Sequence, residues 1–170
     1  MSVSDFLERG ALVNPGAVCL RQGAVAITYG DARSWMRRVA NTLLAEERGH
    51  GRHAAVWCDN DALGFLCSLG VMRAGMAYVP LDTRSAASDH ERILAFADVE
   101  VLFFQRRYAD AVLALRPRLP RLQRLVCLDA ALPGVSDLAA WCAGASDGEP
   151  SVEVALESTA WLQTGSGTSG

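Results

Sequence analysis

The residues best suited to chemistry are the last seven of the chain, in which glycines are interspersed with threonine and serine. Glycine permits positive φ angles and lets the backbone approach a ligand closely. Successive backbone N–H groups in such turns form a concavity that binds anions, and hydroxyl side chains add donors without bulk. We therefore interpret this segment as a seat for phosphate groups. Its candidate binding residues are Thr164, Gly165, Ser166, Gly167, Thr168, Ser169 and Gly170.

Composition alone favours another interpretation, because Gly/Ser/Thr-rich chain ends are more often flexible linkers than ligand sites. The preceding residues favour a ligand site. Residues 160–163 begin with an apolar run that predicts a buried strand, and the loop follows it directly. A P-loop of the kinase and GTPase type is excluded, since that motif needs a lysine and this chain has none.

The composition is that of a globular protein with a single domain. The chain has 170 residues, 51% of them apolar, and a net charge of −3. This charge argues against nucleic acid as a partner. The most apolar window, residues 63–72, is far shorter than the ~20 residues of a membrane-spanning helix, so we expect no membrane span. Five scattered cysteines without metal-binding spacing favour reduced thiols in the cytoplasm and no metal site.

The elements that would position the loop follow a regular pattern. Two short apolar runs before residue 29 predict a hairpin, and a helix is expected from about Asp31. From residue 54 onward strands and helices alternate. The predicted strands are 54–58, 76–81, 101–104, 125–128 and 160–163. One predicted helix is capped by Asn60 and ends at Gly75, and another begins with a capping box at Ser88. Two further helices are predicted over residues 108–115 and 135–142.

This alternation predicts an α/β fold with a mostly parallel sheet covered by helices on its faces, after a short N-terminal hairpin. Ligands of such open sheets bind beyond the carboxyl ends of the strands. The terminal loop follows the last predicted strand and would therefore lie where a ligand is expected. We assign most other conspicuous residues to structure. Trp35, Trp57 and Tyr78 are predicted to be core, Asp82 to order the turn after Pro80, and the run 59–61 to cap a helix.

Two motifs resemble one enzyme family. The sequence Gly70-Val-Met-Arg-Ala-Gly75-Met-Ala-Tyr-Val-Pro80-Leu-Asp82, preceded by Ile27-Thr28-Tyr29, is similar to the N-terminal part of adenylate-forming (AMP-binding) enzymes. These are the acyl-CoA synthetases, the adenylation domains of nonribosomal peptide synthetases and the luciferases. Their phosphate loop, (Y)-T-S-G-T-T-G-x-P-K-G, resembles residues 166–170. Thr164 and Gly165 depart from the family, which often has an aromatic residue and threonine there.

The resemblance implies ATP-dependent activation of a small-molecule carboxylic acid as an acyl-adenylate, with release of pyrophosphate. A thiol of CoA, or of the phosphopantetheine on an acyl- or peptidyl-carrier protein, would then accept the acyl group. ATP and Mg²⁺ are the implied cofactors, and residues 164–170 would bind phosphate rather than act as acid–base catalysts. Residues 1–170 would be the N-terminal part of an AMP-binding domain, truncated just after the start of the phosphate loop. Family members are several hundred residues long, so we expect this chain alone to be inactive.

An alternative from another class is a non-catalytic α/β binding or scaffolding module that keeps the loop as a relic anion site. The sequence that follows Gly170 in the gene would discriminate between the two. A dinucleotide-binding oxidoreductase is disfavoured, because no strand is followed by G-x-G-x-x-G at the start of a helix.

Overall fold

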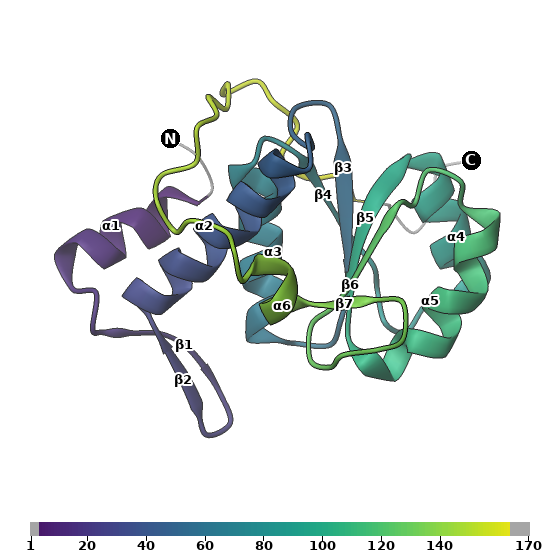
Figure 1. The fold of residues 1–170 in the computed structure, drawn as a ribbon, viewed down its shortest axis with the longest axis horizontal. Coiled ribbons are helices and arrows are strands. Elements are labelled where there is room, and N and C mark those ends of the chain that lie inside the picture. Colours follow the sequence, from purple (N-terminus) through teal and green to yellow (C-terminus); the bar gives the residue numbers. More distant parts are fainter. Residues whose placement is uncertain (1–3, 164–170) are drawn as a thin grey trace.

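The centre of the protein is a five-stranded parallel sheet (Figure 1). The structure, a computed structural model, describes residues 4–163. Neighbouring strands follow the order β4-β3-β5-β6-β7, and every pair is parallel. The strands are β3 (His53–Trp57), β4 (Ala77–Pro80), β5 (Val99–Phe104), β6 (Arg124–Cys127) and β7 (Ser136–Asp137). The predicted parallel α/β fold is confirmed.

Helices cover both faces of the sheet. α2 and α3 lie with α6 on one face, and α4 and α5 cover the other (Figure 1). None of the described helices is long and apolar enough to cross a membrane. The helices are α1 (Asp5–Val13), α2 (Tyr29–Ala45), α3 (Ala62–Arg73), α4 (Ala87–Phe96), α5 (Ala109–Leu115) and α6 (Leu138–Cys142), with 3-10 turns η1 (Arg106–Tyr108) and η2 (Arg116–Arg118).

The central strand β5 shows why the core has two layers. All six of its residues are buried, as expected for a parallel strand covered on both faces. Successive side chains of a strand point to opposite faces. Leu102 and Phe104 therefore join the apolar cluster beneath α4 and α5. Val101 and Phe103 join the cluster beneath α2, α3 and α6.

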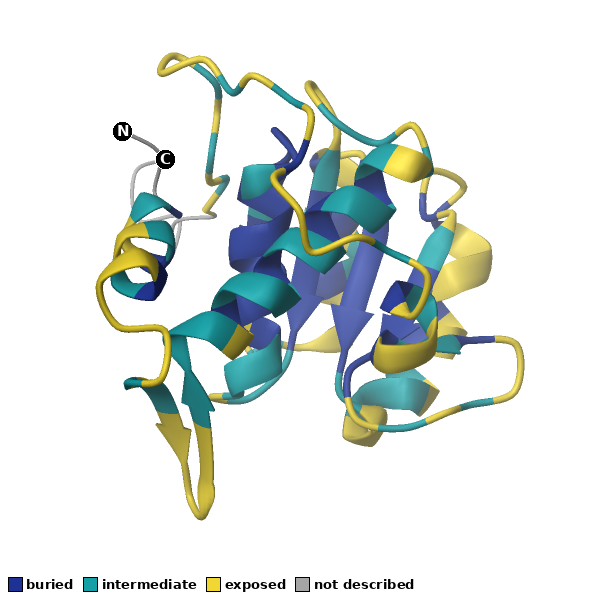
Figure 2. Ribbon diagram, turned by 60° about the vertical axis from the view of Figure 1, so that its left-hand side comes forward, coloured by how far each residue is buried: buried dark blue, intermediate teal, exposed yellow. Residues whose placement is uncertain are grey.

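An antiparallel hairpin precedes the sheet, as predicted. Its strands are β1 (Val18–Gln22) and β2 (Val25–Thr28). Gly23 in the turn has φ +58°, a left-handed conformation that glycine adopts without steric penalty. Figure 2 shows the hairpin projecting from the body with its tip exposed. The hairpin is joined to the body at its base, where β2 runs directly into α2. It is also fastened next to its turn, because the Gln22 side chain accepts the Ala62 N–H at 2.9 Å and donates to the Asn60 carbonyl at 3.3 Å.

Two helix caps differ from the prediction. α3 is capped by Asp61 rather than Asn60, because the Asp61 carboxylate accepts a hydrogen bond from the Gly64 N–H at 2.9 Å. α4 begins after Ala86, which makes no side-chain cap hydrogen bond. Ser88 lies inside the first turn of α4, so the predicted capping box is wrong. Both errors move a helix start by only one or two residues.

The predicted helix over residues 135–142 is also shorter. Ser136 and Asp137 pair with β6 as the edge strand β7, and the helix begins only at Leu138. Asp137 ends the strand and caps the helix at once, because its carboxylate accepts the Ala140 N–H at 2.9 Å. A two-residue strand has no hydrophobic alternation of its own, so the sequence gives no signal for it.

After α6 the chain forms a strap, residues 143–163, which has no helix and no named strand. The strap crosses over α2 and returns to the sheet edge at β4 (Figure 1, yellow-green to yellow). There the Tyr78 N–H donates to the Ala160 carbonyl at 3.0 Å and the Leu162 N–H donates to the Tyr78 carbonyl at 2.9 Å. These two bonds make one parallel bridge between Tyr78 and Trp161.

The prediction of a buried final strand over residues 160–163 is correct in that the segment pairs with the sheet, and wrong in that the segment is neither a full strand nor buried. The pairing is parallel, and it attaches the segment to the expected sheet. However, it consists of a single bridge, and Trp161 is 55% exposed. The physical reason is its position at the edge, where β4 is its only partner strand among the described residues.

Candidate functional site

The carboxyl ends of the parallel strands form one edge of the sheet, and the strand order changes direction between β3 and β5. A ligand of an open α/β sheet is expected in a crevice at this point. Here the chain's own side chains occupy the position. The Gln105 Oε1 accepts the Asp59 N–H at 2.8 Å, and the Tyr108 hydroxyl donates to Asp59 Oδ1 at 2.7 Å. Arg107 pairs with the second oxygen of Asp59.

These contacts explain the acidic run at residues 59–61. The hydrogen bond from Tyr108 and the positive charge of Arg107 lower the pKa of the Asp59 carboxyl. Burial and the hydrogen bond to Asp59 raise the pKa of Tyr108. Asp61 caps α3. The prediction that this run serves helix capping is therefore confirmed for Asp61, while Asp59 joins the loops that follow β3 and β5.

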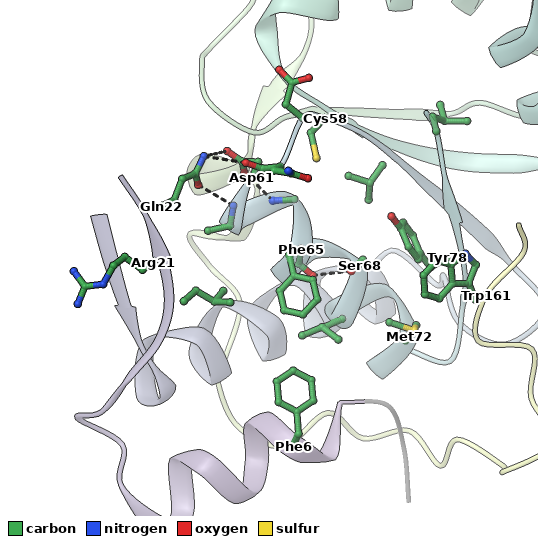
Figure 3. Close-up of a pocket in the computed structure, with 18 residues that line it drawn as sticks. Phe6, Arg21, Gln22, Cys58, Asp61, Phe65, Ser68, Met72, Tyr78 and Trp161 are labelled. Carbon is green, nitrogen blue, oxygen red and sulfur yellow. Dashed lines mark hydrogen bonds between the residues drawn. The ribbon is translucent and has the colours of Figure 1, made fainter. Parts of the chain in front are cut away.

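A hollow of about 660 Å³ lies between the hairpin, α1, α3 and β4 (Figure 3). Its lining is mostly apolar. The rings of Phe6 and Phe65 lie 6.5 Å apart, and those of Tyr78 and Trp161 lie 5.5 Å apart. Trp161 belongs to the strap, so a side chain close to the last described residue forms part of the wall of the hollow.

Two groups in this hollow could in principle react, Cys58 and Tyr78. Burial, with the charges of Asp61 and Asp59, raises the pKa of the Cys58 thiol to about 12. Burial likewise raises the pKa of Tyr78 to about 12. A thiol is nucleophilic only as the thiolate, so Cys58 is not activated near neutral pH. The hollow suits contact with an apolar surface better than covalent chemistry.

The predicted phosphate seat follows this wall. Because the bridge to Tyr78 is parallel, the chain after Trp161 runs in the direction of β4, toward the edge that carries Asp82. Gln163 is the last residue described. All seven predicted site residues, Thr164 to Gly170, lie outside the described residues. Their binding role therefore stays a prediction.

Comparison with known proteins identifies the family. The AMP-binding enzyme family matches residues 7–170. This chain belongs to that family. Pyochelin synthetase PchF of Pseudomonas aeruginosa is 32% identical over 99 residues, which are 58% of this chain and 5% of PchF. A medium/long-chain-fatty-acid–CoA/3-oxocholest-4-en-26-oate–CoA ligase of Mycobacterium marinum is 23% identical over 74% of this chain and 23% of the ligase. The chain thus spans a quarter or less of the length of these relatives.

Solved structures agree on the fold of this AMP-binding chain. The N-terminal domain of FACL13 from Mycobacterium tuberculosis superimposes with a TM-score of 0.87 at 23% identity, over 98% of this chain and 42% of that one. The anthranilate CoA ligase AuaEII superimposes with a TM-score of 0.81 at 19% identity, over 91% of this chain and 29% of that one. At such identities the likeness establishes the fold alone.

The motif that suggested the AMP-binding family ends in an ordered turn after β4. The Asp82 carboxylate accepts hydrogen bonds from the Arg84 N–H at 3.0 Å and from its guanidinium at 2.9 and 3.1 Å. The predicted role of Asp82 in ordering this turn is confirmed. His90 of α4 contacts the backbone of this turn. It is fully buried, its Nε2 lies 2.8 Å from the Asp82 carbonyl oxygen, and its ring centroid is 4.0 Å from that of Trp57.

We expect the Asp82 carboxyl to titrate with a pKa of about 2, because its hydrogen bonds with Arg84 stabilise the charged form. The folded pKa lies below the unfolded one, so the turn is fully stabilised above the ordinary aspartate range and weakens only as the pH falls toward 2. NMR titration of the side-chain carboxyl carbons measures this value. Arg84→Ala should return the pKa toward about 3.9, whereas Arg92→Ala, which removes another exposed arginine, should not. A pKa near 4 for Asp82 in the unmodified chain would contradict the expectation.

The aromatic residues predicted to be core divide into two groups. Trp57 is 4% exposed and lies in the core. Trp35 and Tyr78 are only partly buried and pack at the margins of the core clusters. Tyr78 is the one that matters for the site, because its backbone holds the strap and its ring lies against Trp161. The sequence could not indicate this role, since the strap that contacts Tyr78 lies about eighty positions further along the chain.

Proposed function

We propose that residues 1–170 form the N-terminal part of an AMP-binding domain that activates a small-molecule carboxylic acid with ATP. The acid would attack the α-phosphorus, giving an acyl-adenylate and pyrophosphate, and a thiol of CoA or phosphopantetheine would then accept the acyl group. The observation that supports this most strongly is the parallel bridge of Trp161 with Tyr78, which directs the chain toward the carboxyl edge of the sheet immediately before the loop. The family match over residues 7–170 supports the same class of reaction.

In this proposal the loop binds the phosphates of ATP and does not transfer protons. The hydroxyls of Ser166, Thr168 and Ser169 and the neighbouring amides would hold the β- and γ-phosphates, so that charge developing on the leaving pyrophosphate is stabilised. This donor set suits phosphate oxygens. Among residues 4–163 no group of three or more metal-ligating side chains occurs, so we assign no protein ligand to Mg²⁺. Mg²⁺ would arrive bound to ATP and neutralise phosphate charge.

The acceptor is proposed from the relatives, and the cytoplasmic location from the five scattered cysteines of the chain. One relative is named as a CoA ligase and another as a synthetase of pyochelin. CoA and an acyl- or peptidyl-carrier protein are therefore both candidate acceptors, in a cytoplasmic enzyme. Fatty, aryl and amino acids all remain candidate substrates.

Carboxylate-dependent exchange of labelled pyrophosphate into ATP tests the proposal. The protein made from the complete reading frame that encodes this chain should exchange with one class in a panel of fatty, aryl and amino acids. Ser166→Ala combined with Thr168→Ala should lower exchange about a hundredfold, because donors to a developing charge are removed. Ser158→Ala, in the strap, is the matched control and should leave exchange unchanged.

Residues 1–170 alone should show no exchange, since they span about a quarter of the ligase relative. Exchange by this chain alone would overturn the proposed inactivity. An intact reading frame whose product exchanges with no acid, or a reading frame that stops at Gly170, would instead favour the non-catalytic binding module.

A further inference from the structure

The strap is held to α2 by hydrogen bonds to its backbone. The Asn41 side-chain amide donates to the Ser146 carbonyl at 2.7 Å and to the Gly148 carbonyl at 3.1 Å. A guanidinium nitrogen of Arg37 donates to the Asp147 carbonyl at 3.4 Å. One face of α2 therefore fixes the path of the first part of the strap, although the two segments lie more than a hundred positions apart in the sequence.

Glu149 adds a charged contact at the end of this anchored part. Its carboxylate lies between two guanidinium groups, at 2.5 Å from Arg37 of α2 and in an ion pair with Arg73 at the end of α3. The side chains of the two arginines are only 16% and 15% exposed. Arg37 also binds the Glu8 carboxylate through two nitrogens, at 2.8 and 2.7 Å. We call Arg37, Arg73 and Glu149 the clasp.

Beyond the clasp the strap is held loosely until it reaches the sheet. His50 Nε2 lies 2.7 Å from the Glu153 carbonyl oxygen. Residues 154–156 and 158–160 then border a hollow of about 310 Å³ that separates them from the end of α3. The next backbone hydrogen bonds between the strap and the rest of the described protein are the two bonds of the bridge at Tyr78. A single bridge at an exposed edge is only marginally stable by itself.

The clasp reduces the entropic penalty of forming that bridge. With Glu149 fixed, the strap enters its last part, residues 150–160, from a set position, and His50 contacts it again at the Glu153 carbonyl. If the clasp opened, the strap would be held before the bridge by the hydrogen bonds from α2 to residues 146–148 and by His50. Each time the His50 contact opened as well, the free segment would extend back to Gly148, so the bridge would form less often. The half-exposed carboxylate of Glu149 makes this a modest, measurable effect rather than a collapse of the fold.

We propose that Glu149, held by Arg37 and Arg73, is a positioning residue that keeps residues 160–162 attached to β4. This attachment sets the point from which the terminal loop leaves the sheet. The consequence for phosphate binding rests on the function proposed above, whereas the effect on the bridge does not.

Hydrogen exchange of the Tyr78 and Leu162 amides measures the attachment directly, because both N–H groups donate only within the bridge. In Glu149→Gln, which keeps the shape but removes the charge, both amides should exchange about fivefold faster. Glu153→Gln is the matched control, since it removes one exposed carboxylate from the same strap. In Glu153→Gln the Tyr78 and Leu162 amides should exchange at the rates of the unmodified chain. The exchange rates of the Val101 and Phe103 amides in the core should be unchanged in both variants.

Equal protection of the Tyr78 and Leu162 amides in Glu149→Gln and Glu153→Gln would overturn the proposal. The affinity for Mg²⁺·tripolyphosphate gives the second readout. If the loop binds polyphosphate, Glu149→Gln should weaken binding by a similar factor and Glu153→Gln should not. If even the unmodified chain binds no tripolyphosphate, the proposed function fails at this step, and the exchange rates still decide whether the clasp positions the strap.

Discussion

Replacement of Gly70 by leucine is expected to lower the free energy of unfolding by about 3 kcal/mol. Gly70 lies where α3 crosses α2, and a Cβ atom placed on it would lie 2.6 Å from the Val39 Cβ and 2.9 Å from the Met36 carbonyl oxygen. The first contact is with a β-branched side chain and the second with helix backbone, so neither can yield without moving α2. Moving α2 would also displace Arg37 and Asn41, which hold the strap.

Urea denaturation followed by circular dichroism measures this loss. Gly144→Leu is the matched control, because a Cβ atom at Gly144 meets no atom within 4 Å. Its effect should stay within about 0.5 kcal/mol. Equal stability of the two variants would mean that α2 and α3 do not pack as closely at Gly70 as the structure indicates.

Glu100→Gln should lower the free energy of unfolding by a similar amount, about 3 kcal/mol, because it removes one partner of a largely buried ion pair. The side chain of Glu100 is 6% exposed, and its carboxylate lies 2.9 Å from Arg48 and 2.6 Å from Arg52. Arg48 is itself 12% exposed. The substitution would leave that buried guanidinium with less compensating charge, which accounts for most of the expected loss.

The same urea titration can test Glu100→Gln against Glu157→Gln, a substitution of an exposed glutamate. The control variant should change stability by no more than about 0.5 kcal/mol. A Glu100→Gln protein as stable as the control would show that the arginines at the amino end of β5 need no carboxylate partner. Arg48 also contacts Glu46 and Gln123, so a smaller loss would measure how far these two residues compensate.

Much of the fold could be predicted from the sequence because each regular element carries its own local signal. The apolar run of β5, the positive φ of +80° at Gly75 after α3, and the turn of the hairpin are all local features. The elements that were missed or misjudged depend on distant partners. β7 exists only because β6 lies beside it, and the bridge at Trp161 exists only because the strap returns to Tyr78.

The site was predictable to a smaller extent. The glycines and hydroxyls of residues 164–170 predict a phosphate seat, and that role stays a prediction. The attachment of residues 160–162 to the sheet depends on contacts between segments far apart in the sequence. Arg37 and Asn41 read as ordinary polar positions of an amphipathic helix, and nothing in their local pattern indicates that they hold residues 146–149. Likewise, the strand order that places β3 beside β5 has no local signal, so the contacts of Gln105 and Tyr108 with Asp59 could not be predicted from the sequence.

The most direct test of the phosphate seat is an NMR titration of the chain with Mg²⁺·tripolyphosphate, compared with a chain that ends at Gln163. The shorter chain keeps every helix and strand that the structure describes. We predict saturable shifts of the amide resonances of residues 164–170 in the longer chain and no binding by the shorter one. Equal binding by both chains, or no shift at residues 164–170 at millimolar tripolyphosphate, would contradict a polyphosphate seat at the end of this sheet.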